Sequence, residues 1–176
     1  MWRLVQRLLE LEYFFGEYLT YPLIPGDGPG RFWQLLFKLP LMLYRYGLHP
    51  LVSGQVLILT TVGRKTGKLR STHLGYTFDP ATKTYYVIAG WKGRTNWYQN
   101  ALATPAVRVR VGARRFEACA TPLAPDRVAA HLALYAKRNP FAPRLFRGFT
   151  GIACDGRHET FLKMAPFYPG LALQPL

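Results

Sequence analysis

The 176-residue sequence contains little of what builds a disulfide framework or a metal centre. It has two cysteines, Cys119 and Cys154, and four scattered histidines. The cysteines form no CxxC pair, so their spacing predicts neither a disulfide framework nor a zinc site. We expect two buried thiols in a reducing cytoplasm. Because acidic residues are also few, at nine, we expect no metal ion.

The sequence also lacks a run that could span a membrane. No uncharged apolar stretch approaches the roughly 20 residues that a transmembrane helix needs. Arg3, Arg7, Glu10 and Glu12 interrupt the first residues, and no signal-peptide cleavage pattern follows them. The pattern predicts a chain that does not cross a membrane.

The first 50 residues carry apolar side chains at helical spacing and are predicted to form an amphipathic helical extension, 1–50. In its second helical run, Arg31, Lys38 and Arg45 recur every seven residues and form one narrow cationic stripe. Two interpretations stay open for this run. It packs on the main domain, or it lies in a membrane interface with the stripe toward lipid head groups. Residues 51–176 are predicted to form the main domain.

The pattern of the main domain predicts the α+β class, mainly β. Short apolar runs predict strands at 56–61, 69–78, 85–89, 107–111 and 114–120, and 158–164 is compatible with a last strand. Helices are predicted at 96–103, capped by Thr95 or Asn96, and at 126–137, capped by Asp126. Strands joined by hairpins favour a small antiparallel barrel with flanking helices. A Rossmann domain is disfavoured because the GxGxxG motif is missing.

Positive charge is concentrated in one part of the chain. Residues 61–115 contain eleven Lys or Arg and one acid, which is ten of the fourteen net positive charges. The segment Gly63–Arg70 contains four of these Lys or Arg residues and two glycines, in a predicted turn between two strands. It does not match the P-loop spacing, and a strand follows it instead of a helix. A glycine turn with exposed amides, Lys and Arg still suits an anion, although a solvated hairpin tip is the alternative.

Other candidate residues have a plain structural alternative beside the functional one. Arg108 and Arg110, on one strand face, are most simply a solvated surface. Trp91, Trp97 and Tyr98 suit either the core or a wall for a planar ring. His73, Tyr98 and Tyr135 are candidates for proton delivery, and no catalytic residue is assigned.

Taken together, the motifs of the main domain resemble the deazaflavin (F420)-dependent nitroreductase family. They run over 55–121, from Leu59-Thr60-Thr61-x-Gly63-Arg64-Lys65-Thr66-Gly67-x-x-Arg70 through Trp97-Tyr98-x-Asn100-x-x-Ala103-x-Pro105 to Val107-x-Val109-x-Val111-Gly112. The resemblance implies a split β-barrel related to flavin-binding oxidoreductases. It also implies coenzyme F420, whose planar deazaflavin ring carries a phosphate and a polyglutamate tail.

The resemblance implies roles for three groups of residues. The first would bind the phosphate and tail: Arg64, Lys65 and Thr66, with Arg70 and Ser71 beside them. The second would surround the ring: Ala89, Gly90, Trp91, Lys92 and Gly93. The third would support that loop: Trp97, Tyr98 and Asn100. The sequence departs from the family at 90–96, where the loop is short, and at its C-terminal end, which lacks a tyrosine-rich segment.

The expected function is that of an oxidoreductase. Hydride would pass from the reduced deazaflavin to an organic acceptor such as a nitroaromatic compound or a quinone. Two alternatives stay open: an FMN-binding oxidoreductase of the same fold, and a basic module that binds nucleic acid. We expect a small-molecule substrate, a cytoplasmic protein with peripheral contact to the inner face of the membrane, and a possible homodimer.

Overall fold

The computed structural model describes residues 56–138 and 142–176, and the statements below refer to these residues. The predicted helical extension, 1–50, lies outside them, and so does its stripe of Arg31, Lys38 and Arg45. Among the described helices, none has both the length and the apolar character that crossing a bilayer requires.

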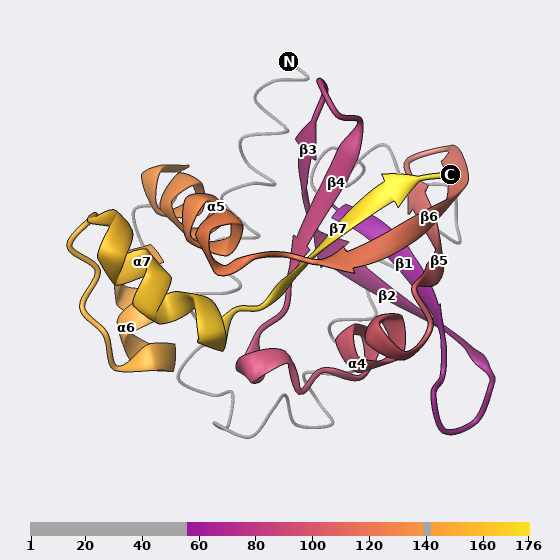
Figure 1. Cartoon of the computed structure of the whole chain (residues 1–176), viewed down its shortest axis with the longest axis horizontal. Coiled ribbons are helices and arrows are strands. Elements are labelled where there is room, and N and C mark those ends of the chain that lie inside the picture. The colour runs from indigo at the N-terminus through magenta and orange to yellow at the C-terminus, as the bar shows by residue number, and fades with distance from the viewer. Residues whose placement is uncertain (1–55, 139–141) are drawn as a thin grey trace, which may run out of the picture.

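Seven antiparallel strands form one sheet in the order β2-β1-β5-β6-β7-β4-β3 (Figure 1). Their bounds are β1 Val56–Val62, β2 Leu69–Gly75, β3 Thr77–Asp79, β4 Thr84–Ile88, β5 Ala106–Val111, β6 Arg114–Pro122 and β7 Gly170–Pro175. The edge strands β2 and β3 are separated in sequence by Tyr76 alone. Since one residue joins the two edges, the sheet must curl until they meet. This confirms the predicted mainly β split barrel with flanking helices.

Alternation along the strands gives the sheet an inner apolar face. On β1, Leu57 and Leu59 are fully buried in a cluster with residues from β4, β5, β6 and β7. Side chains of successive strand residues point to opposite faces, so Thr61 shares the face of Leu57 and Leu59. Burial of this face supplies the main driving force that holds the curled sheet together.

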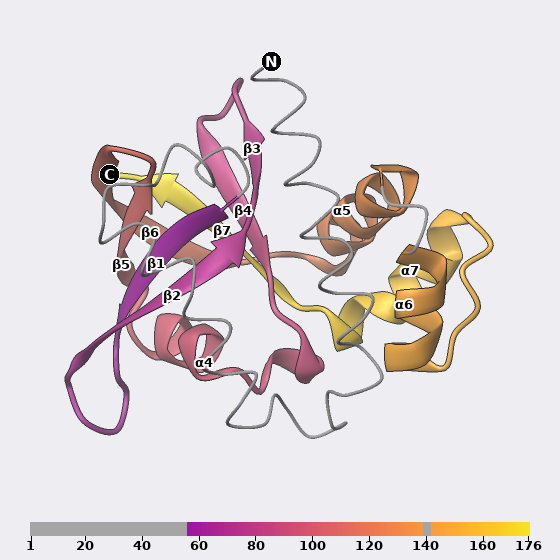
Figure 2. The ribbon, with the colours of Figure 1, turned by 180° about the vertical axis from the view of Figure 1, so that it is seen from behind.

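Helices lie at two places around the sheet. Helix α4, Asn96–Ala103, packs its Trp97, Tyr98 and Ala101 into the inner cluster. The other helices gather on the far side of β4: α5 Pro125–Arg138, α6 Ala142–Thr150 and α7 His158–Met164, with the 3₁₀ turn η4, Ala165–Phe167 (Figures 1 and 2). They form a second apolar core around Phe146 and Phe161.

Two predicted strands differ from the structure. The predicted strand 69–78 breaks at Tyr76, because β2 pairs with β1 whereas β3 pairs with β4 on the other edge. The tail 158–164 is a helix, α7, because Phe161 and Met164 are three residues apart and both bury against α5. The last strand is instead β7, in which the buried Leu171 and Leu173 alternate.

Three smaller expectations also change. Cys119 is exposed, because it alternates with the inward-facing Ala118 and Ala120 on β6, so the expectation of two buried thiols is wrong. Asp126 does not cap α5, which begins at Pro125. It lies in the first turn, where a carboxylate interacts favourably with the helix dipole. Helix α4 begins at Asn96 as predicted, with Thr95 at the N-cap position.

Candidate functional site

The basic turn, residues 63–68, connects β1 to β2 and is closed by its own backbone. Gly63 N donates to Lys68 O over 2.9 Å, and Gly67 N donates to Gly63 O over 2.7 Å. Gly67 has φ of +65°, and a Cβ on Gly63 would lie 3.0 Å from Thr66 Oγ1. The glycines are therefore required by the turn. It holds Lys65 and Lys68 exposed to solvent.

Arg64 ties the basic turn to α4. Its backbone N–H and its Nη1 both donate to Asn100 Oδ1, over 3.2 and 3.0 Å, and Nη1 also donates to Asn96 Oδ1 over 3.2 Å. Asn100 is 4% exposed and donates through Nδ2 to Thr61 Oγ1 over 3.4 Å. These partners are neutral amides and a hydroxyl, so the guanidinium charge is not neutralised by them. Arg64 thus has an anchoring contact that the sequence did not reveal.

The structure separates two residues that the sequence grouped together. Arg70 lies opposite Thr61 in the β1–β2 register, on the face that α4 covers. Ser71 lies opposite Thr60 on the other face, where the two hydroxyl oxygens are 2.9 Å apart. Because neighbouring strand residues point to opposite faces, Arg70 and Ser71 cannot approach one ligand from the same side.

The ring loop, residues 89–95, follows β4 and contains the short 3₁₀ turn η3, Trp91–Gly93. Trp91, Lys92 and Gly93 have φ of 51°, 54° and 72°, three successive left-handed residues of which two are not glycine. Each non-glycine residue in this conformation costs roughly 1–2 kcal/mol. A Cβ on Gly93 would lie 2.9 Å from Pro169 Cγ and 3.0 Å from Tyr98 Cε1. The loop is strained and closely packed on one side.

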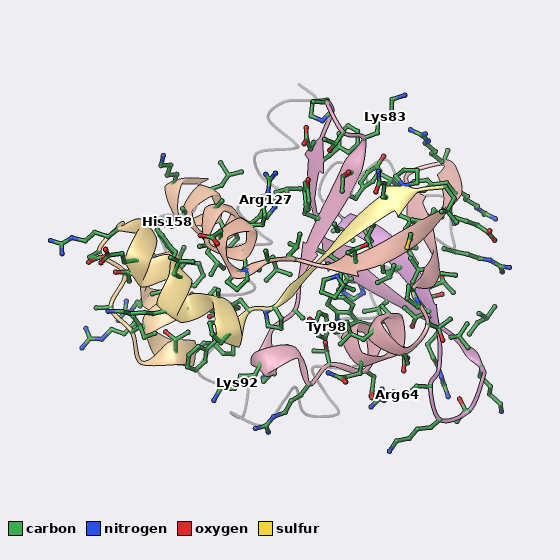
Figure 3. The ribbon with its side chains drawn as sticks, viewed as in Figure 1. Arg64, Lys83, Lys92, Tyr98, Arg127 and His158 are labelled. Atoms are coloured by element: carbon green, nitrogen blue, oxygen red, sulfur yellow. The ribbon has the colours of Figure 1, made fainter. Side chains whose placement is uncertain are left out.

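Aromatic contacts hold the ring loop against the helical core. The Trp91 ring meets Phe149 of α6 edge to face, with centroids 5.9 Å apart. The Lys92 ammonium lies 4.8 Å from the centroid of the Phe167 ring of η4. Gln99 of α4 donates to Gly93 O over 2.9 Å. In Figure 3, Lys92 and Arg64 lie on the same side of the molecule, with α4 between their segments.

Among residues 56–138 and 142–176, two buried polar atoms of the ring loop find no hydrogen-bond partner: Trp91 Nε1 and Thr95 Oγ1. Thr95 stands at the N-cap of α4, yet its side chain makes no capping bond. Sequence reasoning treated Thr95 as a cap and did not place it in the site. No sequence signal distinguishes a capping threonine from one whose hydroxyl points elsewhere, since the choice depends on χ1.

The three candidates for proton delivery lie on separate elements. Tyr98 of α4 contacts the ring loop at Gly93, and burial raises the pKa of its phenol. Tyr135 of α5 packs on Phe146, with ring centroids 6.0 Å apart. His73 lies on the outer face of β2, where burial lowers its pKa to about 4. Of the three, Tyr98 alone lies beside the loop.

Within the described ranges, His, Cys, Asp and Glu side chains form no group of three that could hold a metal ion. The site instead has an exposed basic turn and a strained, partly unsatisfied loop on either side of α4. These two features suit a ligand with an anionic part and a planar part.

Comparison with known proteins assigns the family. The family model of the F420H(2)-dependent quinone reductase matches residues 47–142, which include both the basic turn and the ring loop. The chain belongs to this family.

Individual relatives and solved structures show further similarities. The F420H(2)-dependent quinone reductases Rv1261c and MT1299 of two Mycobacterium tuberculosis strains are each 38% identical over 72 residues, 39% of this chain and 47% of theirs. The chain thus spans about half the length of the curated relatives it matches. A solved F420-H2 dependent reductase (FDR-A) covers 68% of this chain and 94% of its own at 19% identity and TM-score 0.48. A domain-swapped dimer covers 80% and 98% at 19% identity and TM-score 0.51, a likeness of fold.

Proposed function

We propose that this protein is an oxidoreductase that binds coenzyme F420 and reduces a quinone. The observation that supports this best is the basic turn closed on itself and anchored to α4, with the ring loop at the other side of that helix. A deazaflavin with a polyanionic tail needs a cationic segment for the tail and a separate segment for the ring. The printed names of the relatives, F420H(2)-dependent quinone reductases, point to the same ligand and acceptor.

The residues of the turn fit the phosphate and tail. Lys65 and Lys68 are exposed, and Arg70 lies on the side of the sheet that α4 covers. Arg64 is held by Asn96 and Asn100 and retains its charge beside them. Cations on a rigid turn attract a polyanion without much loss of side-chain freedom. Ser71, on the opposite face of β2, has no place in this group.

The residues of the ring loop fit a planar heterocycle. Gly90 has nothing within 4 Å of where a Cβ would lie, so the loop is open at that point. Gly93 is closed by Pro169 and Tyr98 on its own side. Trp91 Nε1 and Thr95 Oγ1 are buried polar atoms without partners, as expected where a ligand supplies them. Trp97, Tyr98 and Asn100 support the loop and turn from α4.

The chemistry divides between ligand and protein. When bound, the reduced deazaflavin supplies a hydride to the acceptor. The chain's own residues orient the reactants and keep water from the ring. A quinone that accepts a hydride also needs one proton to become the quinol. Tyr98 is the candidate donor closest to the loop, and its raised pKa keeps the phenol protonated at neutral pH.

A titration tests the proposal. Binding of oxidised F420, FMN and a single-stranded oligonucleotide is measured by calorimetry at low and high salt. We expect F420 to bind most tightly, and Lys65→Ala to weaken it about three- to tenfold at low salt and less at high salt. Lys83→Ala, at an exposed lysine of another turn, is the control. A preference for FMN would favour a flavin enzyme, and a preference for the oligonucleotide a nucleic-acid module.

The acceptor is tested by turnover. Reduced F420 is mixed with a soluble quinone or with a nitroaromatic compound, and loss of the deazaflavin signal is followed. Faster turnover with the quinone supports the proposed function, whereas faster turnover with the nitroaromatic compound would make nitroreduction the better description.

The proposal extends to where the protein works. Quinones of respiratory membranes are lipophilic, and the stripe of Arg31, Lys38 and Arg45 supports peripheral contact of a cytoplasmic protein with anionic lipid. Reversing these three charges to Glu should abolish co-sedimentation with anionic vesicles. Unchanged co-sedimentation would contradict membrane contact through this stripe.

We also propose a homodimer, supported by the dimeric solved neighbour of the same fold. Sedimentation at several protein concentrations tests it, and a monomer throughout would reject it.

A further inference from the structure

The ring loop contains two buried polar atoms without partners, which is unusual in a protein interior. Buried polar groups are nearly always hydrogen-bonded, since leaving one unpaired costs about as much as its desolvation. The Thr95 hydroxyl and the Trp91 indole N–H both break this rule, and they lie four residues apart in one loop. Two other buried threonines obey it: Thr84 Oγ1 donates to Thr82 O over 3.2 Å, and Thr61 Oγ1 accepts from Asn100.

The Thr95 hydroxyl also does not form the capping hydrogen bond that is usual for its position at the start of α4. An N-cap threonine ordinarily accepts a hydrogen bond from the second or third residue of its helix. Thr95 has extended backbone dihedrals that suit a cap, φ −62° and ψ 138°, and still makes no side-chain capping bond. A buried hydroxyl that neither caps the helix nor finds another partner does not stabilise the ligand-free protein.

The backbone beside these two atoms is strained in the same way. Trp91 and Lys92 hold left-handed dihedrals that only glycine adopts readily, and contacts with Phe149 and Phe167 keep them there. Strain of this kind clusters where a protein meets a ligand. The loop is also open at Gly90, where a Cβ would touch nothing within 4 Å. The unpaired donors, the strained backbone and the open position all fall within residues 90–95.

We infer that the Thr95 hydroxyl and the Trp91 indole N–H are the hydrogen-bond donors that recognise the carbonyl oxygens of the deazaflavin ring. This rests on the proposed function. The indole N–H can only donate, and a hydroxyl can donate, so both match a carbonyl acceptor. A polar site left unpaired without its ligand discriminates strongly against rings that lack the matching acceptors. Thr95 and Trp91 are therefore specificity-determining residues.

The test uses an isosteric substitution in the full-length protein. Thr95→Val removes the hydroxyl and keeps the shape. Because the hydroxyl is unpaired without ligand, we expect the melting temperature of the free protein to rise by about 1–4 °C. We expect F420 binding, measured by calorimetry, to weaken about three- to tenfold. The stability and the affinity thus change in opposite directions.

Thr84→Val is the matched control. Thr84 is also a buried threonine, but its hydroxyl has a partner and it lies at the start of β4. We expect this variant to melt lower than the wild type and to bind F420 as tightly. Trp91→Phe is the second variant: it removes the indole N–H, keeps an aromatic ring toward Phe149, and should weaken binding by a similar factor.

The outcomes separate this inference from the proposed function. If the wild-type protein does not bind F420, the proposed function fails and this inference with it. If the wild type binds F420 and both Thr95→Val and Trp91→Phe bind it equally well, the inference alone is overturned. A melting temperature of Thr95→Val that falls as far as that of Thr84→Val would also overturn it, because the hydroxyl would then have a structural partner.

Discussion

The basic turn, 63–68, and the ring loop, 89–95, flank the same helix, but they differ in whether their polar groups have hydrogen-bond partners. In the basic turn, backbone bonds close on Gly63, and Arg64 is anchored on Asn96 and Asn100. In the ring loop, two residues other than glycine are left-handed, and two buried polar atoms are unpaired. The turn is satisfied without a ligand, whereas the loop is not.

In the proposed function, the two segments would contribute differently to ligand binding. A turn with paired polar atoms and exposed cations needs no rearrangement to attract an anion, so it supplies long-range attraction and affinity. A loop with unpaired polar atoms gains most from a ligand that matches them, so it supplies selectivity. In the proposed function, the cations of the basic turn would therefore bind the anionic tail of the ligand, and the ring loop would lie where the acceptor meets the ring.

The largest effect is expected at the glycine of the ring loop. Gly93→Ala would place a Cβ 2.9 Å from Pro169 Cγ at φ +72°, and we expect it to lower the free energy of unfolding by roughly 2–5 kcal/mol. The matched change in the basic turn is Gly67→Ala, where φ is +65° but nothing lies within 4 Å. It should cost only about 1–2 kcal/mol. Denaturant unfolding of both variants is the measurement, and equal losses would show that the two segments are packed alike.

The strand that carries the basic turn should contribute pH-dependent stability. Burial lowers the pKa of His73 to about 4, below its unfolded value near 6.5. Between these values the unfolded state binds the proton and the folded state does not. Stability should therefore fall by up to about 3 kcal/mol as the pH drops from 6.5 to 4.

His73→Gln should remove that part of the pH dependence. Thermal unfolding across this range is the measurement, with His158→Gln at an exposed imidazole as the control for loss of a histidine. If the curve of His73→Gln runs parallel to that of the wild type, the imidazole is not buried in the way the structure indicates.

The Asn100 side chain, which anchors the basic turn, should contribute less to the free energy of unfolding than the packing around Gly93 does. Asn100→Ala removes the acceptor of Arg64 and the partner of Thr61, and we expect a loss of about 2 kcal/mol. Asn96→Ala removes one exposed bond to Arg64 and should cost less than 1 kcal/mol. Unfolding measurements compare them. A loss of free energy of unfolding well below about 2 kcal/mol for Asn100→Ala would mean that the turn keeps its structure without the contact to α4.

The smallest effect on the free energy of unfolding is expected at Lys92, where backbone strain and the attraction to the Phe167 ring oppose each other. Lys92→Gly relieves a left-handed φ of 54° and loses the contact with the Phe167 ring. The two changes nearly cancel, so the free energy of unfolding should shift by less than about 1 kcal/mol. Lys83→Gly relieves a φ of 53° in the turn before β4 and should stabilise by about 1 kcal/mol. If Lys92→Gly stabilises just as much, the contact with Phe167 has no measurable strength.

Local pattern was enough to predict most elements and the family resemblance. Helix α4 begins and ends where predicted, and β1, β4, β5 and β6 lie within two residues of their predicted ends. Their apolar periodicity is strong and each is bounded by glycine, proline or a turn, so tertiary contacts had little to override. The predictions failed where a segment's partner lay far along the chain, as for β2 and β3 on opposite edges and for α7 against α5.

The candidate site divides in the same way. The sequence by itself determined the basic turn, because glycine spacing and clustered Lys and Arg are local properties, and it determined the family. The tertiary structure alone decided that Arg64 is anchored on α4, that Ser71 faces away from Arg70, and that Thr95 and Trp91 are unpaired. Each of these depends on which groups meet after the sheet has curled, and hydrogen-bond partners 36 or 39 residues apart leave no mark on the spacing of residues along the chain.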